Sequence, residues 1–381
     1  MCSSVNQQKP LKPLWKRITR KIHLWVGLSA LLPLVIIAST GIILSMIFIN
    51  DEVKTSISNA ESYVATPSDI KYIVDISKNY ETDDFKLALI RFPEKTDGEI
   101  TMRFFDSKKN MKQVILEPKT FNVIKFENGN TFEKFILKLH HTLLFKDGGE
   151  VFVGFIGFIL CIICISGVII WFPKIPINIS QVKNISIPKF SLHGRALNIN
   201  LHKSFGIWMA IFLLVVGFTG TFLVFSKEFQ SAVSHFSMVR DFKKTAVEYQ
   251  LNNGQLKGVD IELIAKNVIL SVSEISEIHT ILAVHFPQKN DPYRFTIRPN
   301  NYKTGGHGIS VFVMQNGTIL EIRDPINYSK GEKFLMWLGM LHKGSGMGVI
   351  WRCLQVIFGS SILLFAYTGL MIWWKKPTKL A

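Results

Sequence analysis

Four apolar runs dominate the pattern of hydrophobic and polar positions along the chain. They cover roughly residues 22–49, 151–172, 205–225 and 348–374. A helix needs about 20 apolar residues to cross a hydrocarbon core of ~30 Å, and each run is long enough. The stretches after the first and the third runs mix polar, charged and apolar positions. The pattern therefore predicts four membrane-spanning helices and two soluble inserts.

Both inserts have the same predicted order of elements. Each begins with a helical stretch, at 67–80 and 260–273, and continues with four short strands. Turn signals such as Asn128-Gly129 and Gln315-Asn316-Gly317 bound these strands. A helix packed on a small antiparallel sheet is a common α+β arrangement. We expect two α+β inserts, and neither contains the pattern of a catalytic triad, a phosphate loop or a metal cage.

A set of histidine positions occurs twice in the chain. His23 and His202 begin the first and third runs, and each is followed by Gly at +4 and by Thr-Gly at +17 and +18. His140 and His342 precede the second and fourth runs, with Ser-Gly or Thr-Gly at +26 and +27 and Trp at +31. Such self-similarity indicates an internal duplication. The predicted fold is an α-helical membrane protein with a four-helix bundle made of two equivalent halves.

The glycines of this pattern predict a close approach along one helix face. They are Gly27, Gly41, Gly206 and Gly220. An 18-residue step is five helical turns, so each histidine and its two glycines share a face. Such a face admits a neighbouring helix or a flat macrocycle. Ionisable groups at this depth are costly and usually functional, although an interfacial histidine on a helix-packing seam is the alternative interpretation.

The positive charge of the chain indicates its topology. The net charge is +16, but residues 1–21, 173–203 and 375–381 hold six, five and three Lys or Arg and no Asp or Glu. All three segments lie on one side of a four-span topology, and positive charge in short loops marks the cytoplasmic side. We expect a multi-pass protein in contact with membrane lipid, with both termini cytoplasmic and no nucleic-acid partner.

These patterns divide the chain into successive segments. The first run is too long for a signal-peptide core, so we expect a retained helix, in which Pro33 is a candidate kink. The segments are a basic tail (1–21), the first span (22–49), the first insert (50–130), an amphipathic outer segment (131–150), the second span (151–172), a cytoplasmic loop (173–203), the third span (204–226), the second insert (227–329), a second amphipathic segment (330–347), the fourth span (348–374) and a cytoplasmic tail (375–381).

Two imidazoles at each membrane face fit the axial positions of a haem, whose own ring supplies the four equatorial ligands. Zinc would need three or four ligands in one cluster. We therefore predict two haem b groups, with His23 and His202 binding the inner iron and His140 and His342 the outer one. Two haems would divide a ~30 Å crossing into shorter electron steps. Bis-histidine ligation leaves no open iron position, which suits electron transfer.

Cations near the inner pair are candidate partners of haem propionates. Arg17, Arg20 and Lys203 lie close to the two histidines in sequence, and a buried carboxylate requires a cation. Topology alone is the alternative role for these charges. Four other histidines are interpreted as solvated surface residues: His193, His279, His285 and His307. His235, beyond the third run, is a weaker alternative ligand of the outer haem, because its counterpart in the first half is Ser56.

Two alternatives concern the outer pair. His141 would replace His140 if the amphipathic helix were shifted, although His140 lies beside the apolar face of that helix. Glu150 and Arg352 occupy equivalent positions in the two halves. We expect them to lie near the outer haem, with Arg352 closer to a propionate and Glu150 pairing with it or lining a substrate approach. Extension of both side chains to the lipid headgroups is the alternative.

With these residues, the chain resembles the PepSY-associated transmembrane family of iron-regulated inner-membrane proteins linked to siderophore use. The resemblance rests on the segments 20–27 and 201–206, on Leu139-His140, and on 341–344 with Arg352. It implies a bacterial inner-membrane location and two PepSY domains in the inserts. It also implies a di-haem reductase that takes electrons from a cytoplasmic or quinol donor and reduces a ferric siderophore in the periplasm.

Two other functions stay open. The first is a haem-free membrane scaffold whose PepSY domains bind peptides or regulate a protease. The second is a transporter of siderophore or iron, since repeated halves also build transporters. Four spans with no predicted broken helix make a transporter the weaker of the two.

Overall fold

The computed structural model describes residues 13–107, 110–128, 132–172, 179–240, 259–273, 279–287, 291–299 and 308–374. The chain forms two compact units. The helical unit comprises Met1–Met46, Ile136–Ser226 and Cys353–Ala381, and the sheet unit comprises Ile47–Phe135 and Lys227–Arg352.

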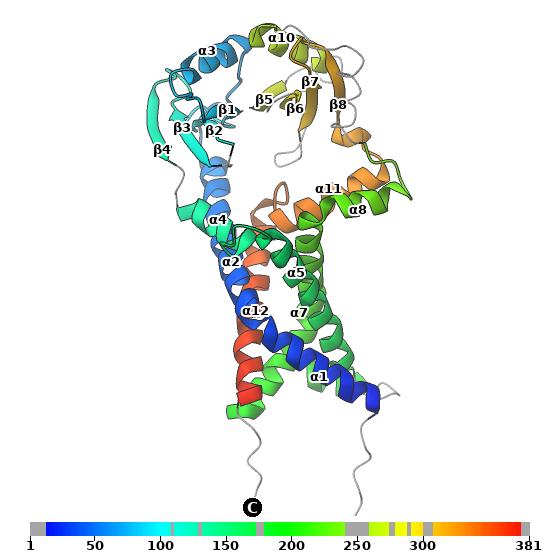
Figure 1. Cartoon of the computed structure of the whole chain (residues 1–381). Coiled ribbons are helices and arrows are strands. Elements are labelled where there is room, and N and C mark those ends of the chain that lie inside the picture. Colours follow the sequence, from blue (N-terminus) through cyan, green and yellow to red (C-terminus); the bar gives the residue numbers. More distant parts are fainter. Residues whose placement is uncertain are drawn as a thin grey trace, which may run out of the picture. The chain divides into compact units, whose positions relative to one another are not determined.

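The helical unit is built from long apolar helices, labelled in Figure 1. Four described helices are long and apolar enough to cross a membrane. They are α2 (Leu31–Ile57), α5 (Gly149–Trp171), α7 (Gly194–Val224) and α12 (Gly348–Trp374). The shorter helices α1 (Leu14–Ser29) and α6 (Ile179–Ser186) precede α2 and α7. The prediction of four spans is confirmed.

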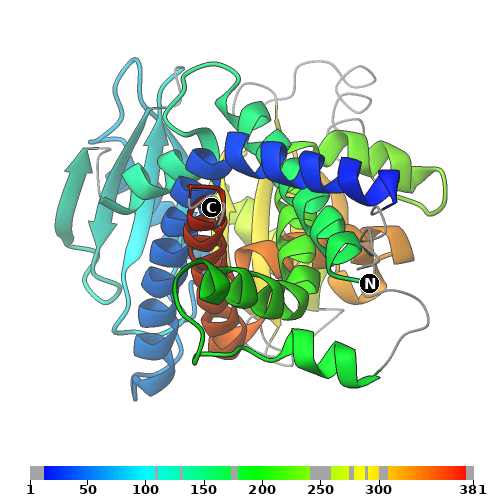
Figure 2. The same cartoon turned by 90° about the horizontal axis from the view of Figure 1, so that it is seen from below.

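The first apolar run is two helices and not one. α1 ends at Ser29, Ala30 has φ −90° and ψ 0°, and α2 begins at Leu31. Pro33 has no amide hydrogen, and its ring conflicts with the carbonyl of the residue four positions earlier, which is Ser29. Pro33 therefore interrupts the helix instead of kinking it, and α1 and α2 run in different directions (Figure 2). The first candidate span is Leu31–Ile57 and not 22–49.

Glycines bring α5 and α7 into close contact. A Cβ atom on Gly157 would lie 2.9 Å from the carbonyl oxygen of Gly217, and one on Gly217 would lie 2.8 Å from the carbonyl oxygen of Gly157. The Thr221 hydroxyl donates to Gly217 O at 2.9 Å and lies 3.2 Å from Gly154 O. Small residues at such a crossing allow two membrane helices to pack backbone against backbone.

The sheet unit contains one eight-stranded antiparallel sheet with the strand order β4-β3-β2-β1-β5-β6-β7-β8. The first insert supplies α3 (Pro67–Ser77), β1 (Lys86–Arg91), β2 (Ile100–Phe105), β3 (Met111–Leu116) and β4 (Val123–Asn128). The second supplies α10 (Ile261–Ser273), β5 (His279–His285), β6 (Tyr293–Pro299), β7 (Ile309–Val313) and β8 (Ile319–Arg323). The order of elements is therefore the predicted one in both inserts.

The two inserts meet where β1 pairs with β5. Ile90 lies opposite Val284, and both side chains are fully buried. Helices α3 and α10 cover one face of the sheet (Figure 1), and a single hydrophobic core joins them to strands of both inserts. The inserts are therefore two parts of one domain, because each supplies the neighbour for a strand that would otherwise be an edge.

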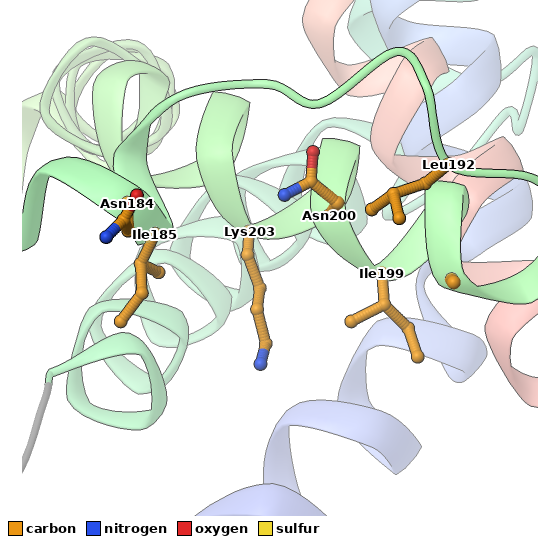
Figure 3. A pocket seen from close by; sticks show the side chains of 7 residues that line it. Asn184, Ile185, Leu192, Ile199, Asn200 and Lys203 are labelled. Atoms are coloured by element: carbon orange, nitrogen blue, oxygen red, sulfur yellow. The ribbon is translucent and has the colours of Figure 1, made fainter. Parts of the chain in front are cut away.

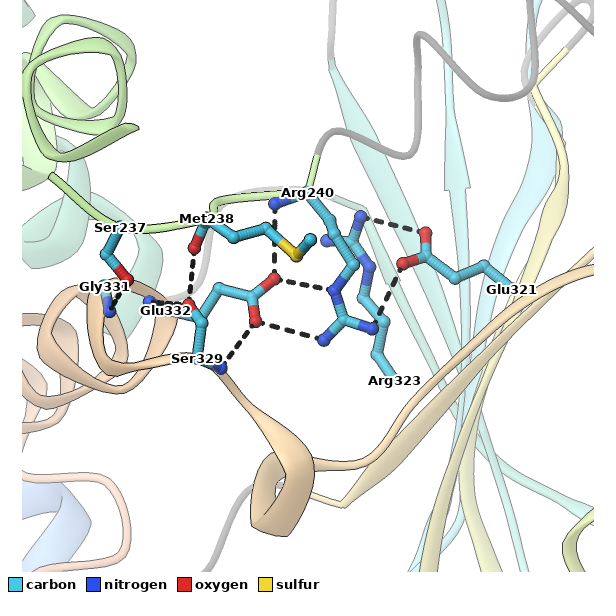
Figure 4. Close-up of polar contacts among 8 residues, drawn as sticks. All are labelled: Ser237, Met238, Arg240, Glu321, Arg323, Ser329, Gly331 and Glu332. Atoms are coloured by element: carbon cyan, nitrogen blue, oxygen red, sulfur yellow. Dashed lines mark hydrogen bonds and ion pairs between the residues drawn. The ribbon is translucent and has the colours of Figure 1, made fainter. Parts of the chain in front are cut away.

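The sheet unit also contains α8 (Ser226–Ser234), α11 (Lys330–Lys343), the end of α2 and the start of α4 (Phe132–Thr142), with a short 3-10 turn at Pro325–Asn327. A polar network joins α11 to the segment after α8 and to β8. The Arg240 guanidinium donates to Glu332 Oε1 at 2.8 Å, and Arg323 pairs with Glu321 at 3.0 Å (Figure 4). Burial alone would raise the pKa of Glu332, but hydrogen bonds from Arg240 and Ser329 outweigh burial and lower it.

Candidate cofactor site

The predicted inner pair of histidines comes together in the helical unit. His23 lies on α1 and His202 on α7, and their ring centroids are 6.2 Å apart with an angle of 89° between the rings. Both side chains are partly buried. The break at Ala30 contributes to this arrangement, because it lets α1 leave the direction of α2 and carry His23 to α5 and α7.

Hydroxyl groups of two other helices hold one nitrogen of each ring. Nδ1 of His23 is 2.9 Å from Ser166 Oγ on α5 and 3.2 Å from the Ile163 carbonyl oxygen. Nδ1 of His202 is 2.9 Å from Thr368 Oγ1 on α12. A metal-binding histidine commonly has its second nitrogen held in this way, which fixes the orientation and the tautomer of the ring.

The position of the proton on each imidazole follows from the direction in which the neighbouring hydroxyl group donates. Ser166 already donates to Ile163 O at 3.0 Å, and Thr368 donates to Leu364 O at 2.8 Å. Each hydroxyl oxygen therefore accepts, and the imidazole donates from Nδ1. This tautomer leaves Nε2 with its lone pair, which is the form in which a neutral imidazole binds a metal.

The glycine after each hydroxyl residue makes room for the ring. A Cβ atom on Gly167 would lie 3.2 Å from Cε1 of His23, and one on Gly369 would lie 3.6 Å from Cε1 of His202. Each Ser-Gly or Thr-Gly pair thus receives a histidine from another helix. Gly41, predicted to share a face with His23, instead approaches His140, whose Cε1 would lie 3.2 Å from an added Cβ.

Gly27 and Gly206 do leave open space beside the inner pair. Each lies one turn after its histidine, and a Cβ atom at either position would meet no atom within 4 Å. A bond from a metal to an imidazole nitrogen is about 2 Å long, so two rings on opposite sides of one ion have centroids about 6 Å apart. The separation of 6.2 Å and the open space fit a flat group bound between His23 and His202.

His140, and not His141, is turned toward a membrane helix. Nδ1 of His140 is 3.0 Å from Thr40 Oγ1 and 3.0 Å from the Ile37 carbonyl oxygen, both on α2. The Thr40 hydroxyl donates to Ile36 O at 2.8 Å, so the proton of His140 is again on Nδ1. His141 is exposed. His342, partly buried on α11, belongs to the sheet unit, and its pairing with His140 stays a prediction.

The cations predicted as propionate partners lie on α1 and α7, and their role stays a prediction. Arg17 and Arg20 are exposed on α1. Lys203 lines a surface hollow between α6 and α7 together with Asn184 and Asn200 (Figure 3). Its side chain therefore borders this hollow, whereas the neighbouring His202 reaches α12.

Arg352 forms its ion pair with Glu52 and not with Glu150, whereas the places of Arg352 near a propionate and of Glu150 along a substrate approach stay predictions. Nε of Arg352 donates to Glu52 Oε2 at 2.9 Å, and its guanidinium lies over the Phe48 ring. Glu150 is exposed in the first turn of α5. Superposing the two halves identifies equivalent positions, but it does not identify contacts. Glu52 was missed because it lies beyond the first apolar run, on the last turns of α2.

The remaining histidines are mostly surface residues. His193 is exposed, as predicted, and His235, the weaker alternative ligand, is exposed too. His307 and the side chain of His279 lie outside the described residues. His285 differs from the prediction, because it is partly buried with its Nε2 2.6 Å from Nη2 of Arg294. In the described ranges, no group of three or more His, Cys, Asp or Glu is arranged to hold a metal ion.

Comparison with known proteins assigns a family. A family model described as PepSY-associated TM region matches residues 20–376. The match includes all four candidate spans, the four predicted ligand histidines and both inserts. A search of curated proteins found no match to this chain.

Proposed function

Because the chain belongs to the PepSY-associated transmembrane family, we propose that it is a di-haem b reductase of the bacterial inner membrane. Its substrate in this proposal is a ferric siderophore in the periplasm, and its electrons come from a cytoplasmic or quinol donor. The observation that carries the proposal is the pair of His23 and His202, with both Nδ1 atoms held by hydroxyl groups and both Nε2 atoms available.

The chain's own residues would bind and orient the cofactor at the inner site. Ser166 and Thr368 fix the tautomer of the two rings, and Gly167 and Gly369 let the rings approach their helices closely. A bound haem b supplies one-electron chemistry through its iron. Apolar helices exclude water from the site, and exclusion of water strengthens the electrostatic control of a buried group.

The outer site is the equivalent proposal for the second half of the crossing. Thr40 and Gly41 hold His140 as Ser166 and Gly167 hold His23. His342 completes the outer pair in this proposal, and an internal duplication would account for the hydroxyl and the glycine found beside His23, His140 and His202. Both termini are placed in the cytoplasm because of the basic segments beside the spans.

An absorbance spectrum of the purified full-length protein tests the proposal. We expect the bands of bis-histidine haem b in the oxidised and reduced states and reduction of a ferric chelate by the reduced protein. His23→Ala and His202→Ala should each remove about half of the haem, because each site uses two axial ligands. His193→Ala, at an exposed position of the same unit, is the control.

Two results would overturn this assignment. Full haem content in both His23→Ala and His202→Ala would show that these residues do not bind the iron. A wild-type protein without any haem band, prepared from haem-replete cells, would instead favour a haem-free scaffold.

A further inference from the structure

One row of residues crosses the centre of the sheet on the face opposite α3 and α10. Cross-strand pairing places Arg103 of β2 beside Leu89 of β1, Leu89 beside His285 of β5, and His285 beside Arg294 of β6. Each of these positions alternates with a fully buried core residue, so all four side chains lie on the second face. Arg91, two residues along β1 from Leu89, lies on that face too.

We call Arg91, Arg103, His285 and Arg294 the arginine face. Neighbouring strands are about 4.8 Å apart, so the backbones at Arg103 and Arg294 are separated by about 14 Å across three strand intervals. Arg294 reaches toward β5, where its Nη2 lies 2.6 Å from His285 Nε2, and Arg91 stands on β1 between the two outer strands. The cluster therefore has the dimensions of a small-molecule site and not of an extended groove.

The three guanidinium groups have no carboxylate partner among the described residues. Glu133, exposed on α4, acts on Arg103 through its charge but forms no ion pair with it among the described residues. Glu94, which follows β1, pairs with Arg298 at 2.8 Å. The Nε atoms of Arg103 and Arg294 are buried and have no hydrogen-bond partner in the described part of the chain. Arg103 and Arg294 are partly buried, and Arg91 is exposed at the border of the cluster. A partly buried cation without a counter-charge is costly, so the cluster is suited to receive an anion.

The histidine of the arginine face is affected by the positive charge of the neighbouring arginines. Nη2 of Arg294 donates to Nε2 of His285 at 2.6 Å, which requires His285 to be neutral. Burial lowers the pKa of His285 to about 4, with the charges of Arg294, Arg91 and Arg103 as further causes. Burial also lowers the pKa of Arg103, and the charge of Arg91 adds to this effect, whereas Glu133 opposes it.

We propose that the arginine face binds a small polyanion whose oxygen atoms are presented in several directions. A guanidinium binds planar oxyanions through two parallel hydrogen bonds, and three of them on rigid strands select for both charge and shape. The identity of the polyanion rests on the proposed reductase function: it is an anionic ferric chelate, of the catecholate or carboxylate class, and not a neutral hydroxamate chelate.

Gallium(III) chelates test this proposal apart from any electron transfer. Gallium(III) has nearly the charge and size of iron(III) but is not reduced under these conditions, so binding is measured whether or not the protein is a reductase. Binding of trianionic gallium tris-catecholate to the full-length protein in detergent is measured by titration calorimetry. A neutral gallium tris-hydroxamate is the matched control ligand.

We expect the trianionic complex to bind, and to bind more weakly as salt is raised. Arg103→Gln and Arg294→Gln should each weaken binding by about tenfold or more, because each removes a charge-assisted contact. Arg103→Lys keeps the charge and should lose less. Lys119→Gln, which removes an exposed cation from the turn between β3 and β4, should bind as wild type does. The unfolding temperature of each variant checks that the sheet is intact.

Three outcomes would overturn the proposal. Equal binding of the neutral and the trianionic complexes would show that charge does not select the ligand. Unchanged binding in both glutamine variants would place the ligand elsewhere. If the variants change binding only to vesicles that contain phosphatidylglycerol, the arginine face contacts lipid headgroups. Binding of the gallium complex by a protein that reduces no ferric chelate would refute the reductase function and leave the anion site in place.

Discussion

Replacing Thr368 by Val tests how His202 is held. Thr368 Oγ1 accepts from His202 Nδ1 at 2.9 Å and donates to Leu364 O at 2.8 Å. His202 Nδ1 has no other hydrogen-bond partner in the described residues. Valine keeps the shape of threonine but removes the acceptor, so the buried Nδ1–H is left unpaired. An unpaired buried donor costs about 1–3 kcal/mol.

This cost predicts the size of the effect on haem binding. A free energy of that size corresponds to about ten- to a hundredfold in affinity, which is also the usual effect of removing the hydrogen-bond partner of a metal-binding histidine. Ser166→Ala should have a smaller effect, about tenfold or less, because His23 Nδ1 keeps the Ile163 carbonyl at 3.2 Å. Thr368→Ser keeps the acceptor and should be close to wild type.

The assay is the haem content per polypeptide, followed by the rate at which haem is lost to an acceptor protein. Ser360→Ala is the control, because Ser360 lies on α12, is exposed and bonds only to its own helix. We expect the order wild type, Thr368→Ser, Ser166→Ala, Thr368→Val in haem retention. A Thr368→Val protein that keeps haem as wild type does would refute the reasoning, whatever Ser166→Ala does.

Three further predictions concern single positions. Gly27→Val should lower haem content with little change in unfolding temperature, because an added Cβ meets no protein atom within 4 Å but fills the proposed cofactor space; equal haem content would show that the space is not used. His140→Ala should remove the outer haem and His141→Ala should keep it, measured from the reduced spectrum, and the reverse result would mean that the helix is shifted. His285 has a pKa lowered to about 4, so its contribution to stability is complete above pH 6.5 and falls as the pH approaches 4. The free energy of unfolding of His285→Gln, measured by denaturant titration, should therefore fall about 2 kcal/mol less than that of wild type between pH 6.5 and pH 4. An equal fall in the two proteins would contradict the burial of a neutral imidazole.

The sequence predicted the histidine pair of the inner site because each histidine is followed by Gly and by Thr-Gly at the same distances along the chain. His23 and His202 occupy the same place in two similar segments, and the structure brings them together. The same offsets also selected Thr40-Gly41, Ser166-Gly167 and Thr368-Gly369, but they did not identify which histidine each pair receives. That information depends on helix packing, since a hydroxyl on one helix reaches a ring that comes from another.

Other errors have local physical causes. The run 22–49 is apolar throughout, so hydropathy alone could not separate α1 from α2, although Pro33 gave the signal for a break. Symmetry gave Glu150 as one candidate partner of Arg352, whereas the carboxylate within reach of Arg352 is Glu52, at 2.9 Å. His285 was interpreted as solvated because it lies in an insert, and only the strand order showed that arginines surround it.

The pairing of β1 with β5 has a consequence for both candidate sites. Neither insert contains the arginine face by itself, because Arg91 and Arg103 come from the first insert and His285 and Arg294 from the second. The inner cofactor site also combines residues from both halves of the chain. His23 and Ser166 belong to the first half, and His202 and Thr368 belong to the second. Each half thus supplies one side of a site that lies between halves. A charged residue in place of the buried Val284 at the β1–β5 contact should separate the two inserts. Anion binding should therefore become weaker. The His23–Ser166 contact within the helical unit should stay unaltered.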